Sequence, residues 1–468
     1  MSPTVGHVVV VGGGLAGLQT ALCCADAGAK VTLFEARPRL GGATWSFQRH
    51  GRSFDNGQHV YLRCCTAYQR FLERVGTLDD APIQDRLSIP VISPRPDGDP
   101  VTVTLGRGAL PAPLHLLGSL ARFSHLSVAD RVRAGLGMAA LKKLRTTDAE
   151  LDEETFASFL SRHGQRETGI ERLFDLVTLP TVNVGADEAS LLLAAKVFRT
   201  GLLGERDAGD IGWARIPLSA LHGDAAERTL DKLGATIHRR ARVDAIEIGR
   251  DRVGEECALG IVADGEHVKA DAVVVAVPHD DAATLLPPGT GIDLSGLTEL
   301  GRSPIIDVHL IFDRKVSDHP MAAALDSPVQ FVFDKTDASG LDGPGQALSI
   351  SVSGADKEVG ERPDVLIERY RAAICDLFPK ARAATLVDAV VSREHEATFR
   401  GRPGTQGIRP TTATRMANLF LAGAWTDTGW PATMEGAVRS GNRAAWHALG
   451  VLDRHHVTPQ STDEERAA

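Results

Sequence analysis

The stretch His7-Val8-Val9-Val10-Val11-Gly12-Gly13-Gly14-Leu15-Ala16-Gly17, with the acid Glu35 that follows it, decides the fold of this chain. The run of valines predicts a buried strand. Gly12, Gly14 and Gly17 have G-x-G-x-x-G spacing, which permits a tight turn, the approach of a pyrophosphate to the backbone and close packing of a helix on the strand. That helix, expected from about 15 to 27, presents free N–H groups to a phosphate. A second strand at 30–34 leads to Glu35, whose carboxylate can accept hydrogen bonds from ribose hydroxyls. Together these parts predict a dinucleotide-binding βαβ unit.

The residues after Glu35 indicate which dinucleotide binds. Arg37 and Arg39 precede Gly41-Gly42, a second glycine turn that a nicotinamide dinucleotide does not need and that an extended FAD molecule does. The segment resembles the GG-doublet signature of the amine oxidase and carotenoid desaturase superfamily of flavoproteins. That signature usually continues with Arg where this chain has Ala43, so we expect Arg37 to contact a phosphate. The expected cofactor is FAD, with contacts in this half of the chain from Gly12, Gly14, Leu15, Ala16, Gly17, Glu35, Ala36, Arg37, Gly41 and Gly42.

Length and composition fit a two-domain enzyme. The chain has 468 residues, 47 of them glycine, which suits an α/β nucleotide-binding fold with many turns. Its formal net charge of −9 gives no indication of nucleic-acid binding. The six cysteines form no C-x-x-C or metal spacing, so we expect reduced thiols, no metal and a cytoplasmic protein. We find no signal-peptide pattern before His7 and no apolar run long enough to span a membrane.

The pattern along the chain indicates interleaved domains. The predicted fold class is α/β, a Rossmann-like FAD-binding domain interleaved with an α+β substrate domain of the amine oxidase and phytoene desaturase type. We expect the FAD-binding domain at 1–76, 217–290 and 406–452. The substrate domain is expected to have a mainly helical part at 77–216 and a sheet part at 291–405, and residues 453–468 are expected to form a disordered tail.

A second motif near the C-terminus supports the same cofactor. An apolar strand ends at Gly423, and a helix is expected to begin near Thr433 and Met434. Such a helix can direct its N-terminus at the side of the flavin where negative charge gathers on reduction. The run resembles the second FAD motif of the same superfamily, in which an acid usually occupies the position of Ala424. Asp427 is a possible replacement. We expect cofactor contacts from Gly423, Ala424, Thr433 and Met434, and from Val243 in the middle of the chain.

Two further runs narrow the resemblance. Phe54-Asp55-Asn56-Gly57-Gln58-His59-Val60 follows the GG doublet, and Leu179-Pro180-Thr181-Val182-Asn183 precedes a helix expected near 188. With the C-terminal motif, they resemble the squalene-associated flavoproteins of hopanoid synthesis, the hydroxysqualene dehydroxylases, over about residues 7–450. The resemblance implies that hydride from reduced FAD replaces the hydroxyl of a C30 allylic alcohol, giving squalene and water. The electron donor is not identifiable. A polyprenoid desaturase of phytoene or squalene type remains an alternative, as does an amine oxidase.

The resemblance also implies roles for individual residues. Asp55 and His59 are the candidates for the acid that protonates the leaving oxygen, although Asp55 could form a turn and His59 could be a core histidine. Gln58 and His59 are expected to face the flavin, because this loop passes over the ring in related flavoproteins. Thr181 and Asn183 are expected either to line the substrate cavity or to cap a helix. Trp425 and Trp430 are expected to be cavity walls.

The implied substrate requires contact with a membrane. Each CH₂ group moved from water to an apolar phase contributes about 0.8 kcal/mol, so a C30 chain stays in the bilayer until an enzyme collects it. The stretch Leu110–Arg145 combines apolar positions with arginines and lysines. It is expected to lie on the inner face of the plasma membrane. The alternative is an amphipathic segment that packs on its own domain.

Overall fold

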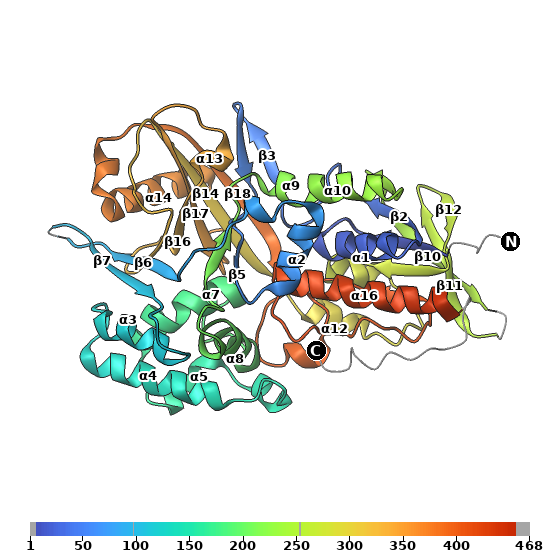
Figure 1. Cartoon of the computed structure of the whole chain (residues 1–468), viewed down its shortest axis with the longest axis horizontal. Helices are drawn as coiled ribbons and strands as arrows, with labels where there is room; N and C mark the ends of the chain where they lie inside the picture. The colour runs from blue at the N-terminus through green and yellow to red at the C-terminus, as the bar shows by residue number, and fades with distance from the viewer. Residues whose placement is uncertain (1–5, 97, 252–253, 455–468) are drawn as a thin grey trace.

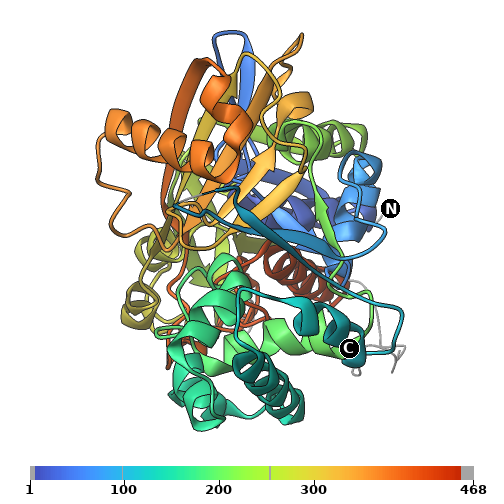
Figure 2. The ribbon, with the colours of Figure 1, turned by 90° about the vertical axis from the view of Figure 1, so that its left-hand side faces the viewer.

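The computed structural model describes residues 6–96, 98–251 and 254–454 (Figure 1). Most of the expected tail at 453–468 therefore lies outside the described residues. In Figure 1 the nucleotide-binding sheet and its helices occupy the right-hand half, and a second sheet with α14 (Pro363–Leu377) occupies the upper left. A helical lobe lies below the second sheet, as Figure 2 also shows from the side.

The nucleotide-binding sheet has five parallel strands that come from three distant segments of the chain. Their order is β19 (Leu419–Leu421), β13 (Ala272–Val275), β1 (His7–Val11), β2 (Lys30–Glu35) and β9 (Thr236–Arg239). The strands are apolar because both faces are covered. Helices cover one face: α1 (Leu15–Asp26), α2 (Thr66–Val75), α9 (Leu218–Leu221), α10 (Gly223–Lys232) and α16 (Met434–Arg454). The other face packs against a small sheet of β10 (Val243–Arg250), β11 (Glu256–Ala263) and β12 (Glu266–Lys269).

The second sheet has two unlike faces. Its seven strands run in the order β18 (Leu386–Thr398), β14 (Ser303–Phe312), β17 (Gln346–Ser353), β16 (Phe331–Asp334), β15 (Met321–Ala324), β6 (Ser88–Ser93) and β7 (Val101–Gly106). Ile306, Val308 and Leu310 of β14 point into an apolar core with α14. Because side chains alternate along a strand, Asp307 and His309 belong to the opposite face. This polar face is part of the candidate site.

The helical lobe is built mainly from residues 114–204. Its helices are η2 (Leu114–Leu116), α3 (Leu117–Arg122), α4 (Val128–Lys143), η3 (Ala149–Glu153), α5 (Phe156–Arg162), α6 (Glu167–Gly169), η4 (Ile170–Phe174), α7 (Asp175–Val182), α8 (Leu191–Phe198) and η5 (Arg199–Gly204). Phe156, Phe174 and Phe198 meet in its core. The helical stretch expected at 110–145 is divided in two, because Ser127 starts α4 by accepting a hydrogen bond from the Asp130 N–H (3.1 Å). The η4 and η5 segments are π-helical turns, which the apolar periodicity did not predict.

Short elements connect these layers. β3 (Ser46–Arg49) and β4 (Arg52–Asp55) form a hairpin, and β5 (Val60–Leu62) pairs with β8 (Ile211–Trp213). The remaining helices are η1 (Leu78–Asp80), α11 (His279–Leu285), α12 (Leu294–Glu299), α13 (Thr336–Ser339), η6 (Pro379–Ala383) and α15 (Thr405–Ile408). Within the described ranges, no helix combines the length and the apolar character needed to cross a membrane.

Candidate functional site

The first glycine turn fits a dinucleotide. Gly12 has a φ of 109°, and a Cβ there would lie 2.5 Å from the Ala276 carbonyl oxygen. A Cβ on Gly17 would lie 1.9 Å from the Gly12 carbonyl oxygen, so only glycine allows α1 to start this close to β1. Gly14 is the N-cap of α1 and offers no side-chain acceptor. The first N–H groups of α1 therefore remain available to a phosphate.

The second glycine turn lies directly on the first. The Gly41 N–H donates to the Gly13 carbonyl (2.8 Å), and a Cβ on Gly42 would lie 2.7 Å from the Gly14 Cα. Arg39 holds this turn by donating to the Gly42 carbonyl (3.0 Å) while its guanidinium stacks 3.7 Å from the Trp45 ring centroid. Arg37, the expected phosphate contact, is exposed. The arginine fixed beside the turn is therefore Arg39.

Glu35 closes the nucleotide end of the site. It is buried, and its two carboxylate oxygens accept the Gly13 and Arg37 N–H groups (both 2.7 Å). A carboxylate oxygen has further lone pairs, so both can still accept from a ribose. The segment before Val243 runs alongside, because Ala241 N donates to the Glu35 carbonyl (3.0 Å) and Arg240 N to that of Arg37 (3.1 Å). Val243 itself is buried at the start of β10, and Ala36 is exposed.

The C-terminal motif brings a second helix N-terminus to the same edge of the sheet. β19 and β1 are parallel, so α16 and α1 both begin at the carboxyl edge of the sheet. Thr433 precedes α16 and accepts the Gly436 N–H (3.2 Å). Gly441 packs on α1, where its Cβ would lie 2.4 Å from the Ala16 carbonyl oxygen. Asp427 accepts the Gly429 N–H (3.0 Å) in its own loop. The two glycine turns, Glu35 and this helix start together fit FAD.

The run from Asp55 to His59 connects the glycine turns to the polar sheet face. Asn56 donates to the Ala43 carbonyl and to Glu394 of β18 (both 2.8 Å), and accepts the Trp45 N–H (2.9 Å). Gln58 donates from its side chain to Ser349 (2.9 Å) and from its backbone to Asp307 (3.2 Å). The run thus lies between the nucleotide-binding turns and the second sheet.

Asp55 forms a buried ion pair. Its carboxylate lies 2.9 Å from Lys335 Nζ and accepts hydrogen bonds from Ser46 Oγ (2.7 Å) and Leu218 N (3.0 Å). Burial alone would raise its pKa, but Lys335 and these hydrogen bonds hold the pKa below its usual range. The proton-donor role expected for Asp55 is not favoured, because such a group is ionised near neutral pH.

His59 and two buried groups of β14 complete the cluster. His59 is half-buried, and burial lowers its pKa, while Asp55 and Glu394 act in the opposite direction. His309 is buried, and its burial lowers its pKa to about 4, so it is neutral at pH 7. Asp307 is fully buried, and burial raises its pKa well above the usual range. The cluster therefore combines a carboxylate whose pKa is lowered by its partners, two imidazoles whose burial favours the neutral form, and a carboxyl group whose burial favours the protonated form.

The other predicted residues lie further from this cluster. Thr181 donates to the Val177 carbonyl (2.6 Å) within α7. Asn183 ends α7 in a left-handed conformation and donates to Thr398 Oγ1 (3.1 Å), which corresponds to the capping alternative. Trp425 is buried and donates to the Val277 carbonyl (2.9 Å). Trp430 lies between Lys196 and Arg439, 5.1 and 5.0 Å from its ring centroid.

Several site residues were missed at the sequence level. The candidates did not include Lys335, Glu394, Asp307 or His309. Asp307 and His309 had a recognisable signal, because two polar residues two positions apart in an apolar strand predict a strand with one polar face. Lys335 and Glu394 had none, since they reach the cluster only through the pairing of distant strands. Across the described ranges, no group of three or more His, Cys, Asp or Glu could hold a metal ion.

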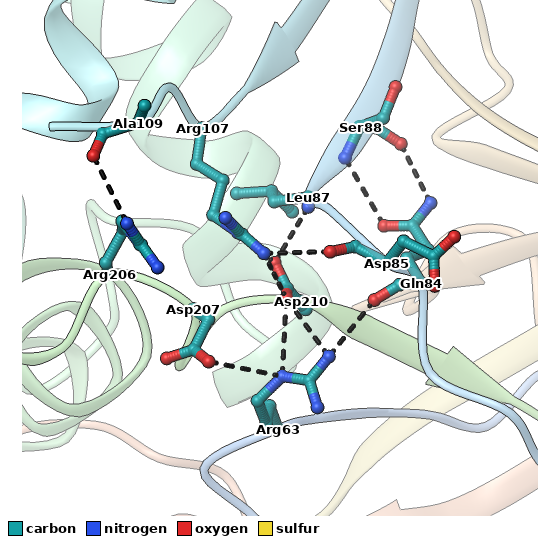
Figure 3. A network of polar contacts seen from close by, with 10 residues as sticks. All are labelled: Arg63, Gln84, Asp85, Leu87, Ser88, Arg107, Ala109, Arg206, Asp207 and Asp210. Atoms are coloured by element: carbon teal, nitrogen blue, oxygen red, sulfur yellow. Dashed lines mark hydrogen bonds and ion pairs between the residues drawn. The ribbon is translucent and has the colours of Figure 1, made fainter.

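A second polar cluster, centred on Asp210, holds the segment that follows His59 in the chain. The fully buried Asp210 accepts hydrogen bonds from Arg107 Nε (2.6 Å), Leu87 N (2.8 Å) and Arg63 Nη2 (3.2 Å), as Figure 3 shows. Arg206 donates to the Ala109 carbonyl (3.2 Å) beside it. This network joins the segment after His59 to the segment that enters the helical lobe.

The helical lobe carries a concentrated apolar surface. Six of the twelve exposed large hydrophobic residues in the described chain lie between 110 and 136. We call these six the apolar patch: Leu110, Leu114, Leu117, Val128, Val132 and Leu136. Residues 110–145 contain six basic side chains and one acidic one, Asp130, which pairs with Arg133 (2.9 Å). The patch is therefore surrounded by net positive charge, in a chain whose net charge is −9.

Comparison with known proteins identifies the relatives of this chain. The model of the family "Flavin containing amine oxidoreductase" matches residues 15–449. A hydroxysqualene dehydroxylase of Rhodopseudomonas palustris is 31% identical over 94% of this chain and 97% of its own. A zeta-carotene desaturase of Zea mays is 24% identical over 95% of this chain and 83% of its own. Among solved structures, a putrescine oxidase bound to putrescine has a TM-score of 0.70 at 18% identity, over 96% of this chain and 99% of its own. These findings confirm the predicted fold class and the predicted cofactor.

Proposed function

The chain belongs to the family of flavin-containing amine oxidoreductases, and on that premise we propose that it reduces hydroxysqualene to squalene with FAD as cofactor. One observation carries the proposal: the similarity to a hydroxysqualene dehydroxylase extends over nearly the full length of both chains. It covers 94% of this chain and 97% of the relative. The similarity to the carotenoid desaturase is lower in identity and covers less of the relative.

The reaction needs a hydride, a proton and a dry cavity. Reduced FAD, when bound, supplies the hydride. The hydroxyl is a poor leaving group, so protonation of its oxygen makes its departure far easier. His59 is half-buried and lies on the loop that joins the second glycine turn to the polar sheet face, so we assign to it the contact with the leaving oxygen. Asn56 holds the loop of His59 against the second glycine turn and Gln58 holds it against β14, while Asp55 binds Ser46 of β3.

A polyprenoid desaturase is the second candidate. The carotenoid desaturase similarity favours it, and the same fold would serve both directions of hydride transfer. The amine oxidase alternative rests on a likeness at 18% identity, which concerns the fold alone.

We also propose that the protein docks on an anionic membrane through the apolar patch and its basic surroundings. A C30 substrate stays in the bilayer, so the enzyme must reach it there. Apolar side chains flanked by lysines and arginines are the combination that binds the boundary of an anionic bilayer. The Asp210 network would hold this patch in a fixed relation to His59, since Arg107 directly precedes the patch segment.

Anaerobic single turnover tests the activity. The holoenzyme is reduced chemically and mixed with hydroxysqualene in phosphatidylglycerol-containing vesicles. We expect the flavin absorbance to return and squalene to form in equal amount. If the reduced enzyme is inert and the oxidised enzyme is instead bleached by squalene or phytoene, the protein is a desaturase.

A further inference from the structure

Asp307 occupies a central position on the polar face of the second sheet. It lies on β14 opposite Ser351 of β17 and Ser392 of β18, and it is fully buried. His309 lies two positions along the same strand and therefore on the same face. A carboxyl group in the middle of a sheet needs an explanation, because its burial is costly without partners.

The two oxygens of this carboxyl group have different surroundings. Oδ1 accepts the Gln58 N–H (3.2 Å), whereas Oδ2 accepts no hydrogen bond of good geometry among the described residues; the Ser351 hydroxyl on the neighbouring strand also stabilises the ionised form. A Cβ on Gly57 would lie 3.4 Å from this Oδ2 and 3.4 Å from His59 Nε2. The two atoms thus approach the same point beside Gly57, and each is within contact distance of it. The absence of a side chain at Gly57 leaves this space free.

Burial and the charges around Asp307 disfavour its ionised form. The loop contributes Asp55 and His59, β14 contributes His309 and β18 contributes Glu394. Burial, the largest cause, raises the pKa of Asp307, and Asp55 and Glu394 add to this rise, against the opposite effect of Ser351 and Gln58. Lys335 is a cation that could lower the pKa of Asp307, but it forms an ion pair with Asp55 (2.9 Å) instead. The carboxyl group of Asp307 therefore favours its protonated form, and its Oδ2 borders the same space beside Gly57 as Nε2 of His59.

We propose that Asp307 supplies the proton for the departing hydroxyl, and that the ring of His59 passes this proton to the leaving oxygen. The inference rests on the proposed function and extends it by naming the proton source. Asp307 is then a positioning and proton-storing residue behind His59.

The step balances in atoms and charge. The C–O bond breaks, and its electron pair leaves with the oxygen. That oxygen takes a proton from the His59 ring, and the ring takes one from the Asp307 carboxyl group. The new C–H bond takes the hydride that FAD would supply when bound in its reduced form, so the alcohol, one hydride and one proton give the hydrocarbon and water. Asp307 ends as a carboxylate and regains a proton from solvent through His59 before the next turnover.

Single-turnover rates of the reduced holoenzyme test the relay. Asp307→Asn keeps the size and the acceptor for Gln58 but has no titratable proton, so we expect squalene formation to slow by about 10²–10⁴-fold. In the wild type the rate falls as pH rises through the pKa of Asp307, and in D307N it is flat over that range. Asp307→Glu retains part of the rate and the fall with pH. His59→Gln should slow squalene formation by a similar factor, and the double variant should be only slightly slower than either single variant. If the two losses in rate instead multiply in the double variant, the two residues act independently and the relay is wrong.

An infrared measurement tests the protonation of Asp307 without turnover. At pH 8 the oxidised holoenzyme should show a protonated-carboxyl band that shifts in D₂O, is absent in D307N and persists in H59Q. Asp313→Asn is the matched control and should leave the band unchanged, because Asp313 has a pKa lowered to about 2 by Arg314. If D307N does not retain FAD, the carboxyl band of the wild-type holoenzyme is followed as the pH is raised. Its disappearance at alkaline pH then tests the protonation of Asp307. A band present in an enzyme that does not convert hydroxysqualene refutes the proposed function alone. A band absent at pH 8 refutes the inference.

Discussion

Replacing three residues of the apolar patch provides a quantitative test of membrane docking. Val128, Val132 and Leu136 follow one another at a spacing of four on α4 and are 69%, 61% and 63% exposed. Burial of a whole Val or Leu side chain contributes about 1.5–3 kcal/mol, so the exposed two-thirds contribute roughly 1–2 kcal/mol each. The triple serine variant therefore loses about 3–6 kcal/mol of membrane binding. This loss corresponds to a partition coefficient about 10²–10⁴-fold lower.

Vesicle flotation measures this change directly. The vesicles contain phosphatidylglycerol, and the fraction of protein that floats is followed against lipid concentration. The control is a double serine variant of Val365 and Val387, which are also exposed (44% and 54%) but lie on α14 and β18. The control should float like the wild type. Both variants should retain yellow cofactor, which shows that they are folded.

Ionic strength separates the apolar contribution from the charged one. The basic side chains of the helical lobe remain in the triple variant, and their attraction is about 1 kcal/mol each near an anionic surface. The screening length falls from about 10 Å at 0.1 M salt to about 3 Å at 1 M. The triple variant should therefore lose a larger share of its binding at 1 M salt than the wild type, because only Leu110, Leu114 and Leu117 of the apolar patch remain. Equal flotation of the triple variant and the wild type would refute the docking proposal.

Three further changes test the site and its supports. Gly17→Ala should abolish FAD binding, because its Cβ would lie 1.9 Å from the Gly12 carbonyl oxygen. The flavin absorbance of the purified protein measures this loss. The control Gly360→Ala, at a position with open space around it, should bind FAD normally. Asp210→Asn should cost about 2–3 kcal/mol in urea unfolding, because the fully buried carboxylate loses its charge-assisted hydrogen bonds with the partly exposed Arg63 and Arg107. The pKa of Asp210 is lowered in the fold, so its contribution is complete above its ordinary pKa and is lost as pH falls; wild type and variant should therefore converge in acid. Lys335→Met should destabilise the protein by a similar amount at pH 7, and a constant difference down to pH 3 would argue against the ion pair with Asp55.

The sequence predicted the nucleotide-binding half closely, because local rules decide it. The valine strand, the glycine spacing and the acid at Glu35 each impose a backbone geometry within about 30 residues. The helix expected from about 15 to 27, the strand expected at 30–34 and the helix start expected near Met434 have the same local basis. These features depend on neighbours in the sequence, and the structure has them within a few residues.

The catalytic cluster was harder to predict, because it depends on pairing between distant strands. Asp55 had the signature of a turn or an acid, and its partner Lys335 lies 280 positions away. Nothing near Lys335 in the sequence indicates that contact. Arg37 appeared better placed than Arg39 by spacing alone, but the stacking on Trp45 that fixes Arg39 is a tertiary contact. The protonation states follow from burial, which the sequence does not give.

The protonation pattern of the cluster bears on the direction of the reaction. A desaturase removes a hydride and a proton from its substrate and therefore needs an acceptor for that proton. A dehydroxylase needs a donor for the oxygen that leaves. Burial favours the protonated form of Asp307, and Asp55 is paired with Lys335, so the cluster offers a proton donor, and the neutral form of the half-buried His59 is suited to pass a proton on. If the cluster served desaturation, His59 would have to be the base, and Asp307→Asn would leave the rate unchanged because Asp307 would have no proton to give. The same variant thus separates the two candidate functions, since only the dehydroxylase requires the proton of Asp307.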